Sequence, residues 1–225
     1  MSSIKQQNKS ESEVDIKIDA EADIKAIFCV PQGAQGVVLF AHGSGRFSPR
    51  NRYIAEELSA NGMAWLLLDL LTEDEEAIDL QTRELRFDIE LLAKRVVIAT
   101  KWLMQNDIAR NLKIGYFGSS TGAAAALVAA AQLGNAVGAV VSRGGRPDLA
   151  ENSLPHVTAP TLLIVGGEDY VVIDLNKSAL KKIQAEKKLA IVPDATHLFE
   201  EPGKLEEAAR LAVEWFLKYL TKSQK

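Results

Sequence analysis

The sequence predicts an α/β protein with a doubly wound, mostly parallel sheet and an antiparallel hairpin at the N-terminal edge. From residue 36 onward, short apolar runs alternate with amphipathic segments of helix length. Most of the apolar runs lack polar alternation, which is typical of parallel strands covered by helices on both faces. Together these two observations define the fold class.

The N-terminal part has a different pattern. Residues 14–30 alternate apolar and polar side chains in two runs separated by a polar turn, which predicts an antiparallel edge hairpin. Residues 1–12 are polar and lack the apolar core of a signal peptide, so we expect a flexible tail. We expect residues 13–225 to form a single domain, a size that can bury a full core.

The remaining elements follow in βαβ order. The predicted strands are residues 36–43, 64–71, 112–118, 136–144, 161–169 and 187–193. The predicted helices are residues 50–62, 85–106, an alanine-rich helix from Thr121, residues 174–186 and residues 204–220. Trp102, Trp215 and Phe216 fall at helical spacing and are expected in the core. The acidic run of residues 72–79 is expected to be a solvated helix start.

Composition narrows the function class. The net charge is −4 and the basic residues are scattered, which argues against a nucleic-acid partner. No window reaches the roughly 18 uncharged apolar residues of a membrane span. The single cysteine, Cys29, is compatible with a reducing compartment, so we expect a cytoplasmic protein. The expected partner is a small molecule, and the sequence does not decide between a monomer and a homodimer.

Polar side chains follow the apolar runs at the ends of the predicted strands. In parallel sheets, ligands bind beyond the carboxyl ends of the strands, so these positions are the candidate site. They are His42, Asp69, Ser119, Ser120, Ser142, Arg143, Glu168, Asp169 and His197.

The segment Gly118–Gly122 reads G-S-S-T-G and matches GxSxG between a predicted strand and a predicted helix. Glycines two residues before and after the central serine would relieve crowding at a sharp turn. The helix from Thr121 would direct its positive end at a developing oxyanion. Ser120 is therefore the candidate nucleophile, although an ordinary tight turn has the same composition.

A serine hydroxyl needs a base, and the chain has three histidines. His156 precedes a strand and is expected at the wrong edge of the sheet. His42 lies in a glycine-rich segment that suits an anion-binding loop better than a mobile base. His197 follows the last strand at the correct edge, so it is the candidate base.

The third member of such a site is a carboxylate that orients the histidine. Asp169 ends a strand between Ser120 and His197 in chain order, as in proteins with the nucleophile-elbow motif. Glu168 is expected to point away from it, and Asp194 to shape the loop before His197. Backbone N–H groups of Ser44 and Thr121 are the candidate oxyanion-hole donors.

The segments "VVLFAHGSG", "GYFGSSTGAAAALVAAA", "LLIVGGEDYVV" and "PDATHLFEEPG" resemble the α/β hydrolases, and among them the small capless proteins related to dienelactone hydrolases. The resemblance implies acyl transfer through Ser120, His197 and Asp169, with water cleaving the acyl-enzyme. Dienelactone hydrolases proper carry cysteine at the elbow, where this chain has Ser120. Only about fifteen residues separate the strands at 136–144 and 161–169, too few for a helical lid, which favours small soluble esters or lactones.

Two alternatives stay open. Gly43, Gly45 and Asp69 partly match a dinucleotide-binding fingerprint, but Ser48 and Pro49 stand where a third glycine belongs. A non-catalytic scaffold of the same fold is the other alternative. We expect no cofactor and no metal, because the chain has no P-loop or HExxH motif and its histidines are far apart.

The arginines of residues 46–52, together with Arg143, could bind an acidic substrate by paired hydrogen bonds. The favoured interpretation is a solvated surface, because exposed arginines are common.

Overall fold

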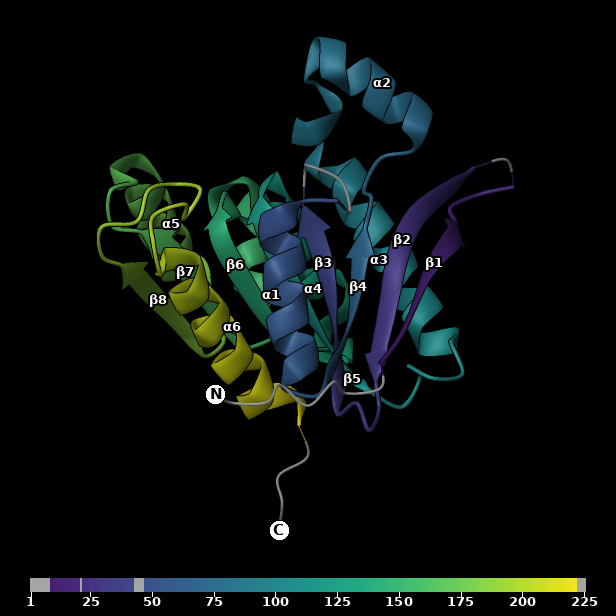
Figure 1. The fold of residues 1–225 in the computed structure, drawn as a ribbon. Helices are drawn as coiled ribbons and strands as arrows, with labels where there is room; N and C mark the ends of the chain where they lie inside the picture. Colours follow the sequence, from purple (N-terminus) through teal and green to yellow (C-terminus); the bar gives the residue numbers. More distant parts are fainter. Residues whose placement is uncertain (1–8, 21, 43–46, 222–225) are drawn as a thin grey trace.

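The computed structural model describes residues 9–20, 22–42 and 47–221. These residues form an eight-stranded sheet in the order β1-β2-β4-β3-β5-β6-β7-β8, with helices on both faces (Figure 1). The strands are β1 (Lys9–Lys17), β2 (Asp23–Pro31), β3 (Gly36–His42), β4 (Met63–Leu68), β5 (Lys113–Ser120), β6 (Val137–Gly145), β7 (Thr161–Gly166) and β8 (Lys187–Val192). The helices are α1 (Pro49–Ala60), α2 (Glu73–Thr82), α3 (Ile89–Gln105), α4 (Thr121–Leu133), α5 (Tyr170–Lys182) and α6 (Lys204–Leu220), with 3-10 helices η1 (Leu85–Phe87), η2 (Gly134–Ala136) and η3 (Pro147–His156).

The N-terminal hairpin is confirmed and is longer than predicted. Strand β1 pairs antiparallel with β2, β2 pairs antiparallel with β4, and the other strand pairs are parallel. The predicted tail is wrong for residues 9–12, since Lys9 already pairs with Pro31. Residues 9–12 are exposed at the edge of the sheet and are held by backbone hydrogen bonds to β2. Because they bury no side chains, their sequence lacks the apolar alternation that predicts a strand. Residues 1–8 lie outside the described part.

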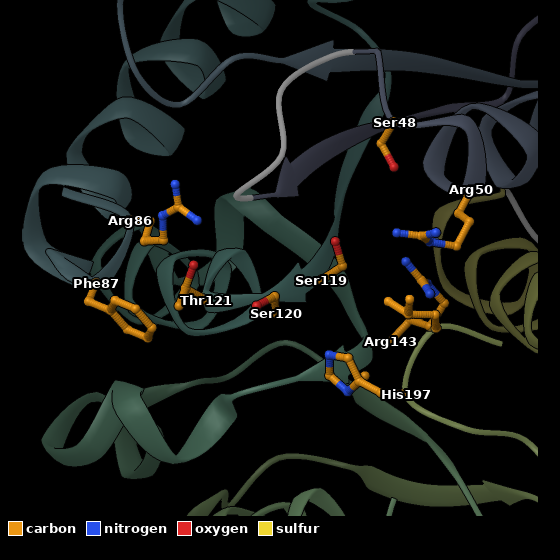
Figure 2. Close-up of a pocket in the computed structure, with 11 residues that line it drawn as sticks. Ser48, Arg50, Arg86, Phe87, Ser119, Ser120, Thr121, Arg143 and His197 are labelled. Carbon is orange, nitrogen blue, oxygen red and sulfur yellow. The ribbon is translucent and has the colours of Figure 1, made fainter. Parts of the chain in front are cut away.

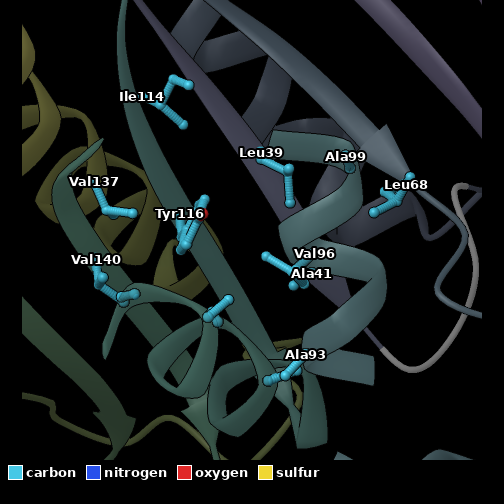
Figure 3. Close-up of a cluster of buried hydrophobic side chains, with 14 of the residues drawn as sticks. Leu39, Ala41, Leu68, Ala93, Val96, Ala99, Ile114, Tyr116, Val137 and Val140 are labelled. Atoms are coloured by element: carbon cyan, nitrogen blue, oxygen red, sulfur yellow. The ribbon is translucent and has the colours of Figure 1, made fainter. Parts of the chain in front are cut away.

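Two apolar cores lie on the two faces of the sheet. On one face, helices α3 and α4 cover side chains such as Leu39, Tyr116 and Val140 (Figure 3). On the other, α1 and α6 cover a second core. Trp215 and Phe216 belong to that second core, as predicted. The central strands are therefore buried on both faces, which is why their sequences lack polar alternation.

Between β4 and α3 the chain leaves the sheet and forms α2 and η1, which project beyond the carboxyl ends of the strands (Figure 1). Thr72 and Glu75 form a capping box at the start of α2, so the acidic run begins a helix as expected. The predicted helix 85–106 is wrong in its first turn. The Asp88 side chain accepts a hydrogen bond from the Leu91 N–H at 3.0 Å and starts α3 at Ile89.

Candidate active site

A cavity of about 260 Å³ opens at the carboxyl edge of the sheet, next to the junction of β5 and α4 (Figure 2). Residues from five separate regions line it: Ser48, Arg50, Arg86, Phe87, Ser119, Ser120, Thr121, Arg143, Gly144, His197 and Leu198. Two of the predicted triad residues, Ser120 and His197, therefore face one cavity.

Ser120 occupies a strained turn between β5 and α4. Its backbone has φ 52° and ψ −131°, a region that a non-glycine residue rarely adopts. A Cβ at Gly118 would lie 2.4 Å from Ala123 Cα, and a Cβ at Gly122 would lie 2.2 Å from the Ala41 carbonyl oxygen. The two flanking glycines are thus required by close backbone approach, for the reason expected from the motif.

Neighbouring backbone holds this turn. The Arg146 N–H donates to the Ser120 carbonyl at 3.0 Å, and Ser120 pairs with Gly145 at a register shift between β5 and β6. The amide of Asn176, which is fully buried, donates to the Gly145 carbonyl at 3.0 Å. Strand β6, the residue that follows it and, through Gly145, helix α5 therefore oppose relaxation of the Ser120 conformation.

His197 and Asp169 are in contact. His197 Nδ1 lies 2.6 Å from Asp169 Oδ2, which is within hydrogen-bond distance. Asp169 is the residue before α5, but its carboxylate makes no capping bond and faces the histidine instead. Gly144, at φ +52°, lies beside the ring, where an added Cβ would be 3.6 Å from His197 Cε1. Because the Asp169 contact occupies Nδ1, Nε2 is the ring nitrogen without a hydrogen-bond partner among the described residues.

The two rival carboxylates lie elsewhere. Glu168 accepts a hydrogen bond from the Tyr170 hydroxyl at 2.7 Å. Asp194 has φ 57° and lies 3.5 Å from the Lys204 ammonium in the loop before His197. Both positions agree with the sequence interpretation.

Ser120 and His197 line the same cavity, yet within the described ranges no hydrogen bond joins their side chains. Such bonds are often long in a free enzyme and tighten when a substrate binds. Because 45% of the His197 side chain is exposed, a small change in its orientation is sterically open.

Thr121 is the first residue of α4 and is buried, so its backbone N–H belongs to the unpaired first turn of that helix. Ser44, the second predicted donor, lies outside the described residues. Of the two candidate oxyanion-hole donors, only Thr121 therefore lies among the described residues.

His42 ends β3 and is 1% exposed. Burial, followed by the nearby Arg143 cation, lowers its pKa from 6.5 to about 4. Neither ring nitrogen has a hydrogen-bond partner among the described residues. A neutral, enclosed ring agrees with the expectation that His42 is not the mobile base.

The favoured interpretation of the arginines as solvated surface is wrong for Arg143. This residue is 5% exposed and lines the cavity, as does Arg50. Arg52 matches that interpretation, since it pairs at the surface with Glu11 at 2.7 Å. In the sequence, only the position of Arg143 at the end of a predicted strand indicated that it could belong to the site.

Sequence reasoning missed Arg86 and Phe87, which reach the cavity from η1 (Figure 2). Asp79 holds this segment in place. It is 3% exposed, and its carboxylate accepts hydrogen bonds from the Arg86 N–H at 2.9 Å and from Arg86 Nε at 2.6 Å. Nothing in the local pattern of residues 79–87 indicates contact with a strand end far along the chain.

Over the described ranges, no group of three or more His, Cys, Asp or Glu side chains could hold a metal ion. The helices of that same part are all too short or too polar to cross a membrane.

Comparison with known proteins gives the chain a family. The profile of the Dienelactone hydrolase family matches residues 24–223. The crystal structure of a dienelactone hydrolase from Anabaena variabilis ATCC 29413 superimposes with a TM-score of 0.91 at 58% identity, over 94% of this chain and 99% of that one. Est1E from Butyrivibrio proteoclasticus has a TM-score of 0.77 over 92% and 98% of the two chains, and its 16% identity shows the shared fold alone.

Two curated relatives from Mycobacterium tuberculosis, each named "Putative phosphoribosyl transferase", are 56% identical over 193 residues. The match covers 85% of this chain and 43% of each relative, so the chain spans less than half their length. The family profile, the Anabaena structure and the strand order agree with one another. This chain has the α/β hydrolase fold and belongs to the dienelactone hydrolase family.

Proposed function

We propose that the protein is a serine hydrolase that cleaves small carboxylic esters or lactones through an acyl-enzyme. The single observation that carries the proposal is the contact of His197 with Asp169 beside the cavity that also exposes Ser120. A strained serine, a histidine and a carboxylate are the parts that nucleophilic acyl transfer requires.

In the proposed reaction, Ser120 Oγ attacks the substrate carbonyl while His197 Nε2 takes its proton. Asp169 holds the ring through Nδ1 and stabilises the imidazolium. The Thr121 N–H and the positive end of α4 receive the charge on the tetrahedral oxygen. His197 then protonates the leaving alcohol. Water, activated by the same histidine, cleaves the acyl-enzyme and restores Ser120.

Family membership supports hydrolysis, because the Anabaena relative is named a dienelactone hydrolase. The name of the mycobacterial proteins refers to chains of which this one matches less than half, and we propose no transferase activity. The dinucleotide alternative depends on Gly43 and Gly45, which lie outside the described residues.

The test is covalent labelling with a fluorophosphonate probe, together with hydrolysis of p-nitrophenyl acetate. Wild-type protein and Ser119→Ala should be labelled, whereas Ser120→Ala should not. Asp169→Asn should lower kcat by about 10³-fold or more, since it leaves the histidine without its carboxylate. Glu168→Gln is the matched control and should change kcat little.

Labelling of Ser120→Ala at the wild-type rate, or absence of both labelling and turnover in folded wild-type protein, would overturn the proposal. The second result would favour the non-catalytic scaffold. Saturable NADH binding measured by fluorescence titration would favour the dinucleotide-binding alternative.

A further inference from the structure

Two arginines occupy one end of the active-site cavity. Figure 2 shows Arg50 and Arg143 beside each other beyond Ser119, on the side away from Arg86 and Phe87. Arg50 comes from the first turn of α1, and Arg143 comes from the end of β6. Ser120 and His197 lie between the two ends of the cavity.

Arg143 is a buried cation that pairs with no carboxylate in the described part of the chain. Its Nη2 donates one long hydrogen bond, 3.3 Å, to Asn51 Oδ1, and its Nε is buried without any partner among the described residues. The guanidinium also lies over the Phe199 ring, 5.5 Å from the ring centre. An unpaired buried charge is costly, so an arginine kept in this state indicates a missing anion.

Arg50 adds a second cation that repels the first. Burial, then the charge of Arg50, lowers the pKa of Arg143 below its ordinary value, to about 10. Arg50 pairs through Nη1 with Glu200 at 3.0 Å, but that carboxylate is 62% exposed. Arg50 Nε is buried and, within the described ranges, makes no hydrogen bond. Arg50 and Arg143 together therefore retain positive charge and N–H donors that no described residue uses.

The same end of the cavity contains further groups suited to an anion. Ser48 lines it and is the N-cap of α1, so its hydroxyl and the positive end of a twelve-residue helix lie beside the arginines. A carboxylate offers two oxygens and one charge, whereas a phosphoryl group offers three oxygens and up to two charges. Two guanidinium groups, a hydroxyl and a helix end match the phosphoryl group better.

We propose that Arg143, Arg50 and Ser48 form a subsite for a phosphoryl group on the ester substrate. The inference rests on the proposed function, because the subsite shares its cavity with Ser120 and His197. It specifies the substrate class as a small ester or lactone that carries a phosphate close to the carbonyl to be cleaved.

Binding is tested without turnover. Inorganic phosphate is titrated calorimetrically into the full-length Ser120→Ala protein at pH 7 and constant ionic strength. Arg143→Gln in this background should weaken phosphate binding about tenfold or more, the loss expected for one charge-assisted pair. Arg50 is less buried than Arg143, so Arg50→Gln is less prone to misfold. It should weaken phosphate binding by a similar factor and tests the subsite even if the Arg143 variant does not fold. Arg52→Gln, on the same helix but facing Glu11, is the control and should bind as the parent does.

Absence of saturable phosphate binding by the Ser120→Ala protein, or binding by the Arg143→Gln and Arg50→Gln variants as tight as in that parent, would overturn the proposal. Tighter binding of succinate than of phosphate would also overturn it, in favour of a carboxylate subsite.

Turnover gives a separate measure. In a pair of aryl acetates with and without a ring phosphate, kcat/KM should favour the phosphorylated ester about tenfold, and Arg143→Gln should remove that preference. Phosphate binding without any ester turnover would refute the hydrolase but not the subsite. Turnover of the neutral ester with no preference for the phosphorylated one would refute the subsite alone.

Discussion

Gly122 allows the close approach of α4 to β3 at the elbow. A methyl group there would lie 2.2 Å from the Ala41 carbonyl oxygen, which is backbone and cannot rotate away. We expect Gly122→Ala to lower the free energy of unfolding by about 3 kcal/mol, the cost of overpacking a tight contact. It should also slow fluorophosphonate labelling, because Ser120 would be displaced. Urea unfolding and labelling rates measure the two effects.

Gly134 is the matched control for that substitution. It has φ +52°, but nothing lies within 4 Å of an added Cβ. Gly134→Ala should cost about 1–2 kcal/mol through backbone strain and leave the labelling rate unchanged. Equal labelling rates in the two variants would contradict the steric account of the elbow.

His42 should make stability depend on pH. Its folded pKa of about 4 lies below its ordinary value of 6.5. Between these values the unfolded chain binds a proton that the native protein does not, so stability falls as pH decreases through this window. The loss should approach about 3 kcal/mol at pH 4.

Free energies of unfolding at pH 7 and pH 4.5 would measure the contribution of His42. His42→Gln should show a smaller decline than wild type, whereas His156→Gln, at an exposed position, should decline as wild type does. An unchanged decline in His42→Gln would show that other groups produce it.

At the scale of elements, the α2–η1 segment forms one wall of the cavity and depends on a buried anchor. Asp79→Ala should release Arg86 and Phe87, raise KM for p-nitrophenyl acetate by roughly three- to tenfold, and cost about 1–3 kcal/mol of stability. kcat should change less than KM, because Asp79 does not contact Ser120 or His197. Asp74→Ala, exposed in the first turn of α2, is the control for general effects on this helix. A lower kcat with unchanged KM in Asp79→Ala would contradict the view that Asp79 acts only by holding the α2–η1 wall of the cavity.

At the scale of the whole molecule, the cavity is small. Its volume of about 260 Å³ lies below the 300–1,000 Å³ of typical drug-sized sites, and η3 packs against α4 without covering it. We expect kcat/KM for p-nitrophenyl acetate to exceed that for the octanoate by about tenfold or more, since a cavity of this volume leaves little room for the longer acyl chain beside the reacting carbonyl. Equal kcat/KM values for the two esters, measured below the micelle concentration, would contradict this.

The sequence by itself determined the strand rhythm, the elbow of Gly118, Ser120 and Gly122, and the candidates Asp169 and His197. These depend on local spacing and on the rule that parallel strands end at one edge. Only the tertiary structure decided that Arg143 is buried, that η1 reaches the cavity, and that β1 begins at Lys9. Burial and edge pairing arise from contacts between segments far apart in the chain, which no local pattern encodes.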